Sequence, residues 1–319
     1  MIEAKHLTKY FGQKVAVDGI SFTVDQGEVL GFLGPNAAGK TTTMRMITGF
    51  LPPTSGTAVI GGDDITGASL SAREKIGYLP ENAPAYLDMT VIGFLDFIAD
   101  IRGFSGRGKI QRVENTLERC FLSNVRFQSI DTLSKGFKQR VCFAQSILHD
   151  PKYLIMDEPT DGLDPNQKHE VRAMIRDMAK EKTIIISTHN LEEVDAVCTR
   201  VIIIADGKIV ADETPERLKA KSSIHGAVCF TAQRAEEEDL VQEVKRIPSV
   251  KTLEILNETE SVITVRVYPK EATAPLAENI IGYFQGKGRP VKSLFVEEGR
   301  LDEVFRMITT SGLGETEER

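Results

Sequence analysis

The chain has 319 residues, of which 41% are hydrophobic and 27% are charged, and its net charge is −7. These proportions are typical of a soluble globular protein with one large or two smaller domains. The acidic balance argues against a primary nucleic-acid binder. No apolar run reaches the roughly 18 residues that span a bilayer, and residues 1–5 lack the apolar core of a signal peptide. Four widely spaced cysteines predict reduced thiols rather than disulfides or a zinc site: Cys120, Cys142, Cys198 and Cys229.

Up to about residue 219, short apolar runs alternate with helical patterns. Four short runs are almost continuously apolar, which is typical of strands buried on both faces of a mostly parallel sheet. They are 29–33, 153–156, 183–186 and 201–204. A helix is expected after Asp164, a good N-cap, and Pro165, a good first helical residue. Its apolar residues recur on one face, at Val171, Met174, Ile175 and Met178. The alternation predicts an α/β core over residues 1–219.

Two segments depart from this alternation of strands and helices. Residues 88–150 are rich in helical patterns and predict a helical insertion. From 220 to 319 the expected order is strand 227–231, helix 236–247, strands 250–256 and 262–268, helix 274–285, strand 291–296 and a last helix 301–308. This β-α-β-β-α-β order is typical of a small α+β domain of the ferredoxin-like kind. We find no catalytic constellation in it.

A glycine-rich loop follows the first apolar run. Gly34-Pro35-Asn36-Ala37-Ala38-Gly39-Lys40-Thr41 matches G-x-x-x-x-G-K-[ST] between an expected strand and an expected helix. Backbone N–H groups and the positive end of the helix dipole would hold the β-phosphate of a nucleotide. We expect Lys40 to reach the β- and γ-phosphates and the Thr41 hydroxyl to ligate Mg²⁺. Thr42, the next residue, is included in the predicted ATP site.

Two later strand ends carry polar side chains. Asp157 and Glu158 follow the run 153–156, where Asp157 suits the acid that positions Mg²⁺, and Glu158 suits the general base for the attacking water. His189 lies three residues after the run 183–186 and could hold that water beside the γ-phosphate. A histidine at a strand end is more often a surface or capping residue, so its role depends on the other motifs.

The motifs together resemble the ATPase subunit of an ATP-binding cassette (ABC) transporter over residues 1 to about 220. The resemblance implies a P-loop core with an antiparallel β subdomain and a helical subdomain. It implies that Phe11 stacks on adenine, with neighbouring Tyr10 as a competitor, and that His189 is the switch histidine. It makes Asp161, Gly162, Leu163 and Asp164 the D-loop. The signature loop, which contacts ATP held by a second copy, would then be Ser134, Lys135, Gly136 and Phe137.

Three departures from the commonest family pattern stand out. Lys135 and Phe137 replace the usual glycine and glutamine of the signature loop, and Ala37 replaces a frequent glycine of the P-loop. Glu81, in Tyr78-Leu79-Pro80-Glu81-Asn82, replaces the usual glutamine and is expected to ligate Mg²⁺ and act in catalysis. We hypothesise that Glu81 makes nucleotide binding more strictly Mg²⁺-dependent. These departures resemble ATPases of the ABC-2 export type, including those of gliding motility, multidrug export and copper-enzyme maturation.

The resemblance implies an enzyme that hydrolyses ATP with Mg²⁺, forms an ATP-dependent head-to-tail homodimer and energises a membrane permease from its cytoplasmic face, with export as the expected direction. The alternative is a soluble ABC ATPase that acts on ribosomes or DNA. The single cassette and the acidic balance favour transport. A P-loop kinase or GTPase would leave residues 133–140 and His189 without a role. Residues 220–319 are expected to regulate or stabilise the dimer, to dock another subunit, or only to stabilise the chain.

Overall fold

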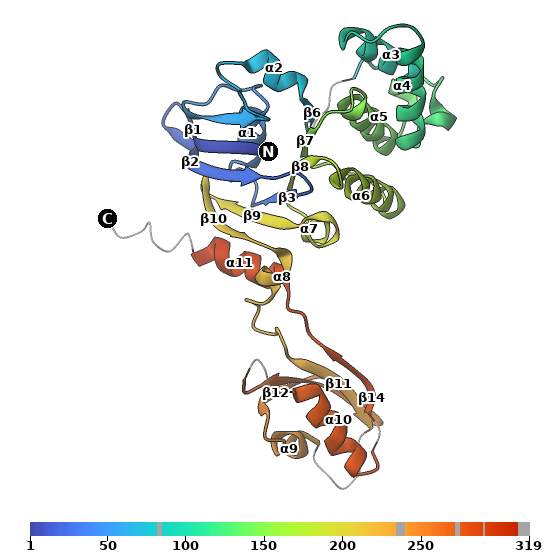
Figure 1. Cartoon of the computed structure of the whole chain (residues 1–319). Coiled ribbons are helices and arrows are strands. Elements are labelled where there is room, and N and C mark those ends of the chain that lie inside the picture. The colour runs from blue at the N-terminus through green and yellow to red at the C-terminus, as the bar shows by residue number, and fades with distance from the viewer. Residues whose placement is uncertain (82–84, 234–239, 272–274, 290, 312–319) are drawn as a thin grey trace. The chain divides into compact units, whose positions relative to one another are not determined.

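The structure is a computed structural model that describes residues 1–81, 85–233, 240–271, 275–289 and 291–311. It contains two compact units (Figure 1). Among the described residues, unit 1 is made of Met1–Pro215 and 308–311, and unit 2 is Glu216–Met307. The boundary predicted after residue 219 therefore lies inside unit 2. Among the described residues, no helix combines the length and the apolarity needed to cross a bilayer.

A six-stranded sheet forms the centre of unit 1. Its strand order is β10-β9-β3-β8-β7-β6, and all neighbours are parallel except β10 and β9. The strands are β3 (Val29–Leu33), β6 (Ile76–Leu79), β7 (Tyr153–Asp157), β8 (Thr183–Thr188), β9 (Arg200–Ala205) and β10 (Lys208–Glu213). Every residue of β3, β7 and β8 is buried. The four strands predicted from continuous apolar runs are thus confirmed, because both faces of the sheet are covered.

A second, antiparallel sheet packs on one side of the first. Its order is β2-β1-β4-β5, from β1 (Ile2–Phe11), β2 (Lys14–Val24), β4 (Ser55–Ile60) and β5 (Asp63–Asp64). Helix α1 (Lys40–Ile47) contributes Met44, Met46 and Ile47 to the apolar core shared by the two sheets, where Phe22 and Phe32 lie with ring centroids 5.5 Å apart. Helix α2 (Ser69–Glu74) precedes β6.

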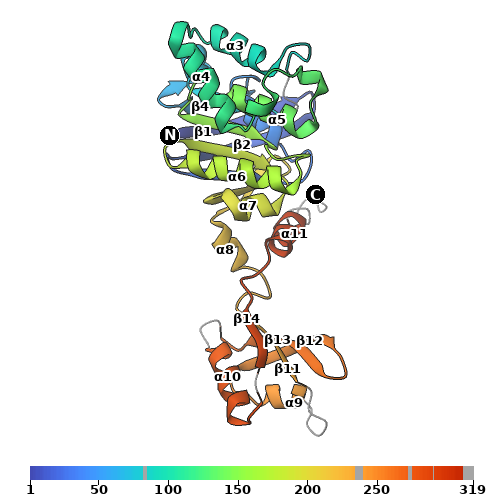
Figure 2. The same cartoon turned by 90° about the vertical axis from the view of Figure 1, so that its right-hand side faces the viewer.

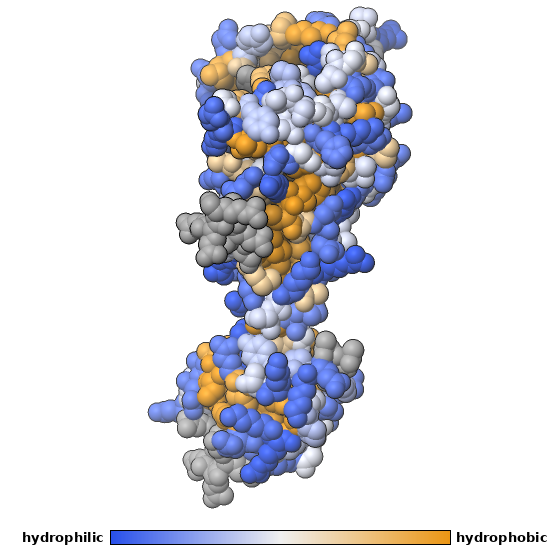
Figure 3. All heavy atoms as spheres, turned by 90° about the vertical axis from the view of Figure 1, so that its left-hand side faces the viewer, coloured by the Kyte–Doolittle hydropathy of each residue, from blue (hydrophilic) through white to orange (hydrophobic). Residues whose placement is uncertain are grey.

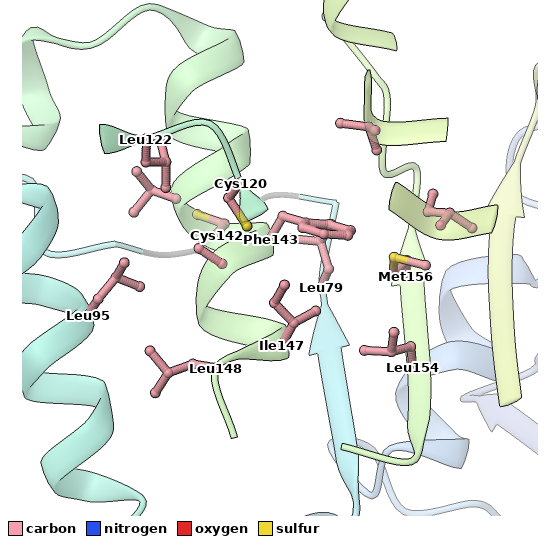
Figure 4. Close-up of a cluster of buried hydrophobic side chains, with 14 of the residues drawn as sticks. Leu79, Leu95, Cys120, Leu122, Cys142, Phe143, Ile147, Leu148, Leu154 and Met156 are labelled. Carbon is pink, nitrogen blue, oxygen red and sulfur yellow. The ribbon is translucent and has the colours of Figure 1, made fainter. Parts of the chain in front are cut away.

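The helical insertion lies beside the other end of the parallel sheet (Figures 1 and 2). It contains α3 (Val91–Ile101), α4 (Gly106–Arg119), α5 (Lys135–Ile147) and two short 3₁₀ turns, Ser123–Val125 and Ile130–Thr132. One continuous apolar core joins these helices to β6, β7 and α6 (Pro165–Ala179). Figure 4 shows Phe143 and Ile147 of α5 on the side toward Leu79 of β6. The insertion is therefore packed against the sheet edge rather than tethered by loops alone.

The start of α6 agrees with the sequence pattern. Asp164 has extended backbone and its carboxylate accepts a hydrogen bond from Gln167 N at 3.0 Å, and Pro165 is the first helical residue. Val171, Ile175 and Met178 are buried, and Met174 packs against the same core. Helix α7 (Leu191–Val197) follows β8 and is capped by Asn190.

Unit 2 has the predicted order of elements. Its strands are β11 (Val228–Gln233), β12 (Val250–Glu258), β13 (Val262–Pro269) and β14 (Val291–Val296). Its helices include α9 (Leu240–Lys245) and α10 (Leu276–Gly286), and its two boundaries fall within α8 (Pro215–Lys219) and α11 (Leu301–Ser311). Residues 236–239 and 274 of the predicted helices lie outside the described residues.

The sheet of unit 2 has the order β12-β13-β11-β14 with antiparallel neighbours, which is the ferredoxin-like arrangement. Both α9 and α10 pack on one face of this sheet, where the ring centroids of Phe230 and Phe284 are 5.3 Å apart. Figure 3 shows apolar patches between hydrophilic side chains on one face of each unit.

Candidate active site

Four neighbouring strands deliver polar residues to one edge of the parallel sheet. Strand pairing sets Leu33, the last residue of β3, beside Thr188 of β8, and Asp157 of β7 beside Ser187 of β8. Leu79, at the end of β6, pairs with Met156. The glycine-rich loop, His189, the Asp157-Glu158 pair and Glu81 follow these strand ends directly. Because the strands are parallel, all four motifs meet at the carboxyl edge, where α/β sheets bind ligands.

The glycine-rich loop leads into α1 without a side-chain cap. Gly39 is the N-cap residue, has φ 110°, and a Cβ there would lie 2.5 Å from Ala16 O. Glycine is therefore required at this position, and the first N–H groups of α1 are not satisfied by the cap side chain. Ala37 also has positive φ, 64°, which a glycine would adopt with less strain. The geometry is that of an anion site at a helix N-terminus.

Lys40 lies inside this loop. Its side chain is buried and Nζ donates to Gly34 O at 2.7 Å and to Pro35 O at 3.1 Å. Burial lowers the pKa of Lys40, and the nearby carboxylates of Glu158, Asp157 and Glu81 oppose that shift. The ammonium is thus held by groups that an incoming anion can replace.

The two carboxylates at the end of β7 have different surroundings. Asp157 is 1% exposed; its Oδ1 accepts a hydrogen bond from Ser187 Oγ, and its buried Oδ2 has no hydrogen-bond partner. Glu158 has left-handed backbone, φ 52°, and Glu158 N donates to Ser187 O at 3.0 Å. The Glu158 Oε1 lies 2.8 Å from His189 Nδ1. Asp157 is fixed within the strand, whereas Glu158 turns away from the sheet into the site.

A cavity of about 550 Å³ is lined by predicted ATP-binding residues, predicted catalytic residues and one residue of the predicted D-loop. They are Phe11, Asn36, Ala37, Gly39, Lys40, Thr41, Thr42, Glu81, Glu158, Asp161 and His189. The cavity lining does not include Gly34, Pro35, Ala38 or Asp157. Tyr10 is 45% exposed and Phe11 50% exposed, and of the two only Phe11 lines the cavity. Phe11 is thus the aromatic side chain available at this wall.

The signature residues lie elsewhere in the described part of the chain: none of the four lines this cavity. Ser134 caps α5 and its Oγ accepts from Phe137 N at 3.4 Å. Phe137 packs against Arg140, whose guanidinium lies 5.5 Å from the ring centroid. Of the D-loop residues, Leu163 is buried in the core and Asp164 caps α6.

Several residues of the site were missed from the sequence. Lys14 and Ala16 of β2 line the cavity beside Phe11, because Phe11 and Lys14 are paired across a tight β1–β2 hairpin. The residues 12–13 between two strand patterns are the signal that could have revealed this. Ser187 was also missed, since its role depends on its strand pairing with Asp157.

The residues present fit a Mg²⁺ ion that is shared with a nucleotide. The described residues contain no group of three or more His, Cys, Asp or Glu side chains that could hold a metal by itself. The available oxygens are the Thr41 hydroxyl, the unpartnered Oδ2 of Asp157 and the carboxylate of Glu81. Mg²⁺ commonly binds through one or two carboxylates together with substrate phosphates, which matches this set.

Comparison with known proteins gives consistent matches. A family model described as ABC transporter matches residues 17–161. The probable multidrug ABC transporter ATP-binding protein YbhF of Escherichia coli is 39% identical over 224 residues, which are 70% of this chain but only 39% of YbhF. The Nod factor export ATP-binding protein I of Burkholderia lata is 37% identical, over 68% of this chain and 72% of that protein. The linearmycin resistance ATP-binding protein LnrL of Bacillus subtilis is 31% identical over 97% of this chain and 98% of that protein.

Solved structures of ABC cassettes match a part of this chain that is about as long as unit 1. The ATP-binding subunit of an ABC transporter has a TM-score of 0.64 and 28% identity, covering 69% of this chain and 92% of that one. A dimeric bacterial ABC transporter cassette, MJ0796, has a TM-score of 0.63 at 23% identity and shows the fold alone; it covers 67% of this chain and 98% of that one. The match with LnrL extends beyond these into unit 2.

Proposed function

This chain belongs to the family of ABC transporter ATP-binding proteins and is an ATPase, and from that premise we propose that it drives export through a partner membrane permease. Relatives named for export and drug resistance support the direction. We further propose that the chain works at the cytoplasmic face of the membrane, held there by the permease, and that nucleic acid is not its partner.

One observation carries the proposed mechanism: the nucleotide cavity lacks the signature residues. Lys40, Glu158 and His189 line one cavity, and Ser134 and Gly136 lie outside it, at the start of α5. A chain alone would therefore leave the γ-phosphate side of its ATP open. Two chains arranged head to tail would close each site with the partner's signature loop, so ATP and dimerisation would stabilise one another.

We assign roles in hydrolysis to several of the site residues. Lys40 would exchange its carbonyl partners for phosphate oxygens and offset their charge. Bound Mg²⁺, held by Thr41, Asp157 through water and Glu81, would supply further charge neutralisation at the β- and γ-phosphates. Phe11 would stack on adenine.

Glu158 and His189 would act on the attacking water. The water oxygen forms a bond to the γ-phosphorus, the bond from that phosphorus to the β–γ bridging oxygen breaks, and ADP leaves. Glu158 takes the proton released by the water. The 2.8 Å contact between Glu158 Oε1 and His189 Nδ1 orients both groups, and His189 can then hold the water or the γ-phosphate from its other nitrogen.

A second cavity supports the proposal of a membrane partner. It has a volume of about 500 Å³ and lies between α1, β6 and α5. Arg45, Arg73 and Arg102 line it together with Phe50, which is 73% exposed. Pro80, also in its wall, is the neighbour of Glu81. A permease segment with a carboxylate and an apolar side chain would complement this cavity, and would sense Glu81 through Pro80.

The first test addresses the dimer. Glu158→Gln should keep ATP binding and slow hydrolysis, so with ATP and Mg²⁺ the variant should elute as a dimer in size-exclusion chromatography. Adding Ser134→Arg to that chain should return it to a monomer while ATP binding persists, because the change lies outside the chain's own cavity. A Glu158→Gln chain that stays monomeric with Mg²⁺-ATP would contradict the mechanism.

The second test addresses the permease. A membrane protein should co-purify with the tagged chain from detergent extract, and Phe50→Asp should reduce its recovery while leaving the basal ATPase rate of the isolated chain unchanged. If only ribosomes or DNA co-purify, the alternative of a soluble ABC ATPase replaces the transport proposal.

A further inference from the structure

An ion pair joins the signature loop to the D-loop within one chain. Lys135, the first residue of α5, places its Nζ 2.9 Å from Asp161 Oδ2. The hydrogen bond from Lys135 holds the pKa of Asp161 below its usual range. The usual glycine at position 135 could not form this contact. The pair therefore belongs to the divergent form of the signature loop found here.

Two glycines lie close to this contact. Gly162 has φ 68°, and a Cβ on it would lie 2.2 Å from Lys135 Nζ and 2.5 Å from its Cε, so the lysine side chain lies across the glycine. One residue further along α5, a Cβ on Gly136 would lie 2.0 Å from Gln167 Oε1 of α6. The start of α5 thus contacts the D-loop at Gly162 and α6 at Gln167, and the positive φ of Gly162 favours glycine at that position.

Asp161 also belongs to the chain's own nucleotide site. Its side chain lines the cavity with Lys40, Glu158 and His189. Asp161 N donates to Glu158 O at 3.1 Å, and His189 further lowers the pKa of the Asp161 carboxyl. A short path of contacts therefore leads from the catalytic pair, Glu158 and His189, through Asp161 to Lys135.

We propose, on the basis of the head-to-tail dimer proposed above, that Lys135 is a positioning residue that couples the two ATP sites. By holding Asp161, Lys135 ties the placement of the signature loop, which serves the partner's ATP, to the state of the chain's own nucleotide site. Lys135 and Asp161 have side chains that are 68% and 52% exposed. A pair so exposed is weak, which suits a contact that is remade in every cycle.

The experiment is a double-mutant cycle in the full chain. The variants are Lys135→Gln, Asp161→Asn, both changes together, and the charge exchange that combines Lys135→Asp with Asp161→Lys. The control is Lys138→Gln, which removes a positive charge one turn further along α5, where Lys138 Nζ donates to Asp131 O at 2.9 Å. The readouts are kcat, the Hill coefficient for ATP, and the ATP affinity of the single chain.

We expect Lys135→Gln to lower kcat about fivefold and to bring the Hill coefficient close to 1, with ATP affinity of the single chain within twofold of the parent. The double variant should be no slower than the single variants, the charge exchange should restore most of the cooperativity, and Lys138→Gln should change neither quantity. If Lys135→Gln slows hydrolysis by the same factor in the Asp161→Asn background, Lys135 acts on the partner's phosphate directly and the inference is wrong.

The two proposals fail in distinguishable ways. A parent chain with a Hill coefficient of 1, whose Glu158→Gln variant also stays monomeric with Mg²⁺-ATP, would overturn the dimer and this inference with it. A cooperative parent whose Lys135 and Asp161 variants remain fully cooperative would overturn this inference alone.

Discussion

Arg140 offers a sharp test of how the signature loop is held in place. It lies on α5 and is 6% exposed. Its guanidinium pairs with the Glu170 carboxylate of α6 and lies 5.5 Å from the Phe137 ring centroid and 5.6 Å from that of Phe121. Arg140 therefore connects Phe137 of the signature loop with the ATPase core. The change we consider is Arg140→Met, which keeps an unbranched apolar stem and removes the guanidinium.

The structure allows the cost to be worked out. The Glu170 side chain is 39% exposed and would regain water, so losing the ion pair should cost only about 1 kcal/mol. Each cation–π contact adds roughly 0.5–1 kcal/mol. Because Arg140 Nε is buried without a hydrogen-bond partner, removing it relieves a desolvation cost and offsets part of the lost free energy. We expect a net loss of about 2 kcal/mol in the free energy of unfolding.

The assays are urea denaturation and steady-state ATP hydrolysis. Arg140→Met should lower the denaturation midpoint without changing the slope, and it should lower kcat several-fold because Phe137 is no longer held. ATP affinity of the single chain should stay within twofold, since Arg140 does not line the nucleotide cavity. Arg140→Lys should cost about half as much, because an ammonium can pair with Glu170 but does not stack on two rings.

The control is Arg107→Met, which removes an exposed arginine from α4 of the same helical part. It should leave stability within about 0.5 kcal/mol of the parent. If Arg140→Met proved as stable as the parent or more so, the desolvation of the buried guanidinium would outweigh its contacts, and the reasoning above would be refuted.

Three further predictions concern individual residues. Phe11→Ala should weaken ATP binding about tenfold by titration calorimetry, as expected for the loss of roughly 1–3 kcal/mol of base stacking, whereas Tyr10→Ala should change it less than twofold; the reverse order would exchange their roles. Ser187→Ala should lower the nucleotide-free unfolding free energy by about 1–3 kcal/mol in urea, because the buried Asp157 carboxylate loses its hydroxyl donor; a change below about 0.5 kcal/mol would show that this bond is dispensable. Burial, aided by the charge of nearby cations, lowers the pKa of His149 from 6.5 to about 4. Neutral His149 therefore makes its full contribution to the free energy of unfolding above pH 6.5, and this contribution is lost as pH falls toward 4. Between pH 7 and 4.5 the parent should lose about 2–3 kcal/mol more than His149→Gln, and equal losses would contradict the pKa shift.

The local sequence pattern was enough to predict the strands that are buried on both faces. The apolar runs at β3, β7, β8 and β9 have no polar interruptions, and they form strands of the parallel sheet. The resemblance to export-type ABC ATPases, drawn from the motifs alone, is confirmed by the family match and by the relatives. The β-α-β-β-α-β order of unit 2 was likewise readable, since each element there carries its own period.

Strands of the antiparallel sheet were not resolved one by one from the sequence. Strand β1 pairs with β2 through register shifts between Ala4 and Leu7, between Leu7 and Lys9, and between Lys9 and Tyr10. Each shift displaces the alternation of inward and outward residues, so a strict period of two is absent. For the same reason the sequence could not choose between Tyr10 and Phe11, which are exposed to similar extents.

The amino-acid sequence by itself determined which chemical groups are present: a phosphate loop, two carboxylates after an apolar strand, a histidine after another, and a lysine in the signature loop. Each of these depends on neighbours within a few residues. Only the tertiary structure decided that Ser187 supports Asp157, that Lys14 stands beside Phe11 and that Lys135 holds Asp161. These contacts join segments that are distant in sequence, or depend on the exact pairing of strands. Burial of the shared core, rather than any local preference, brings the elements that carry them together.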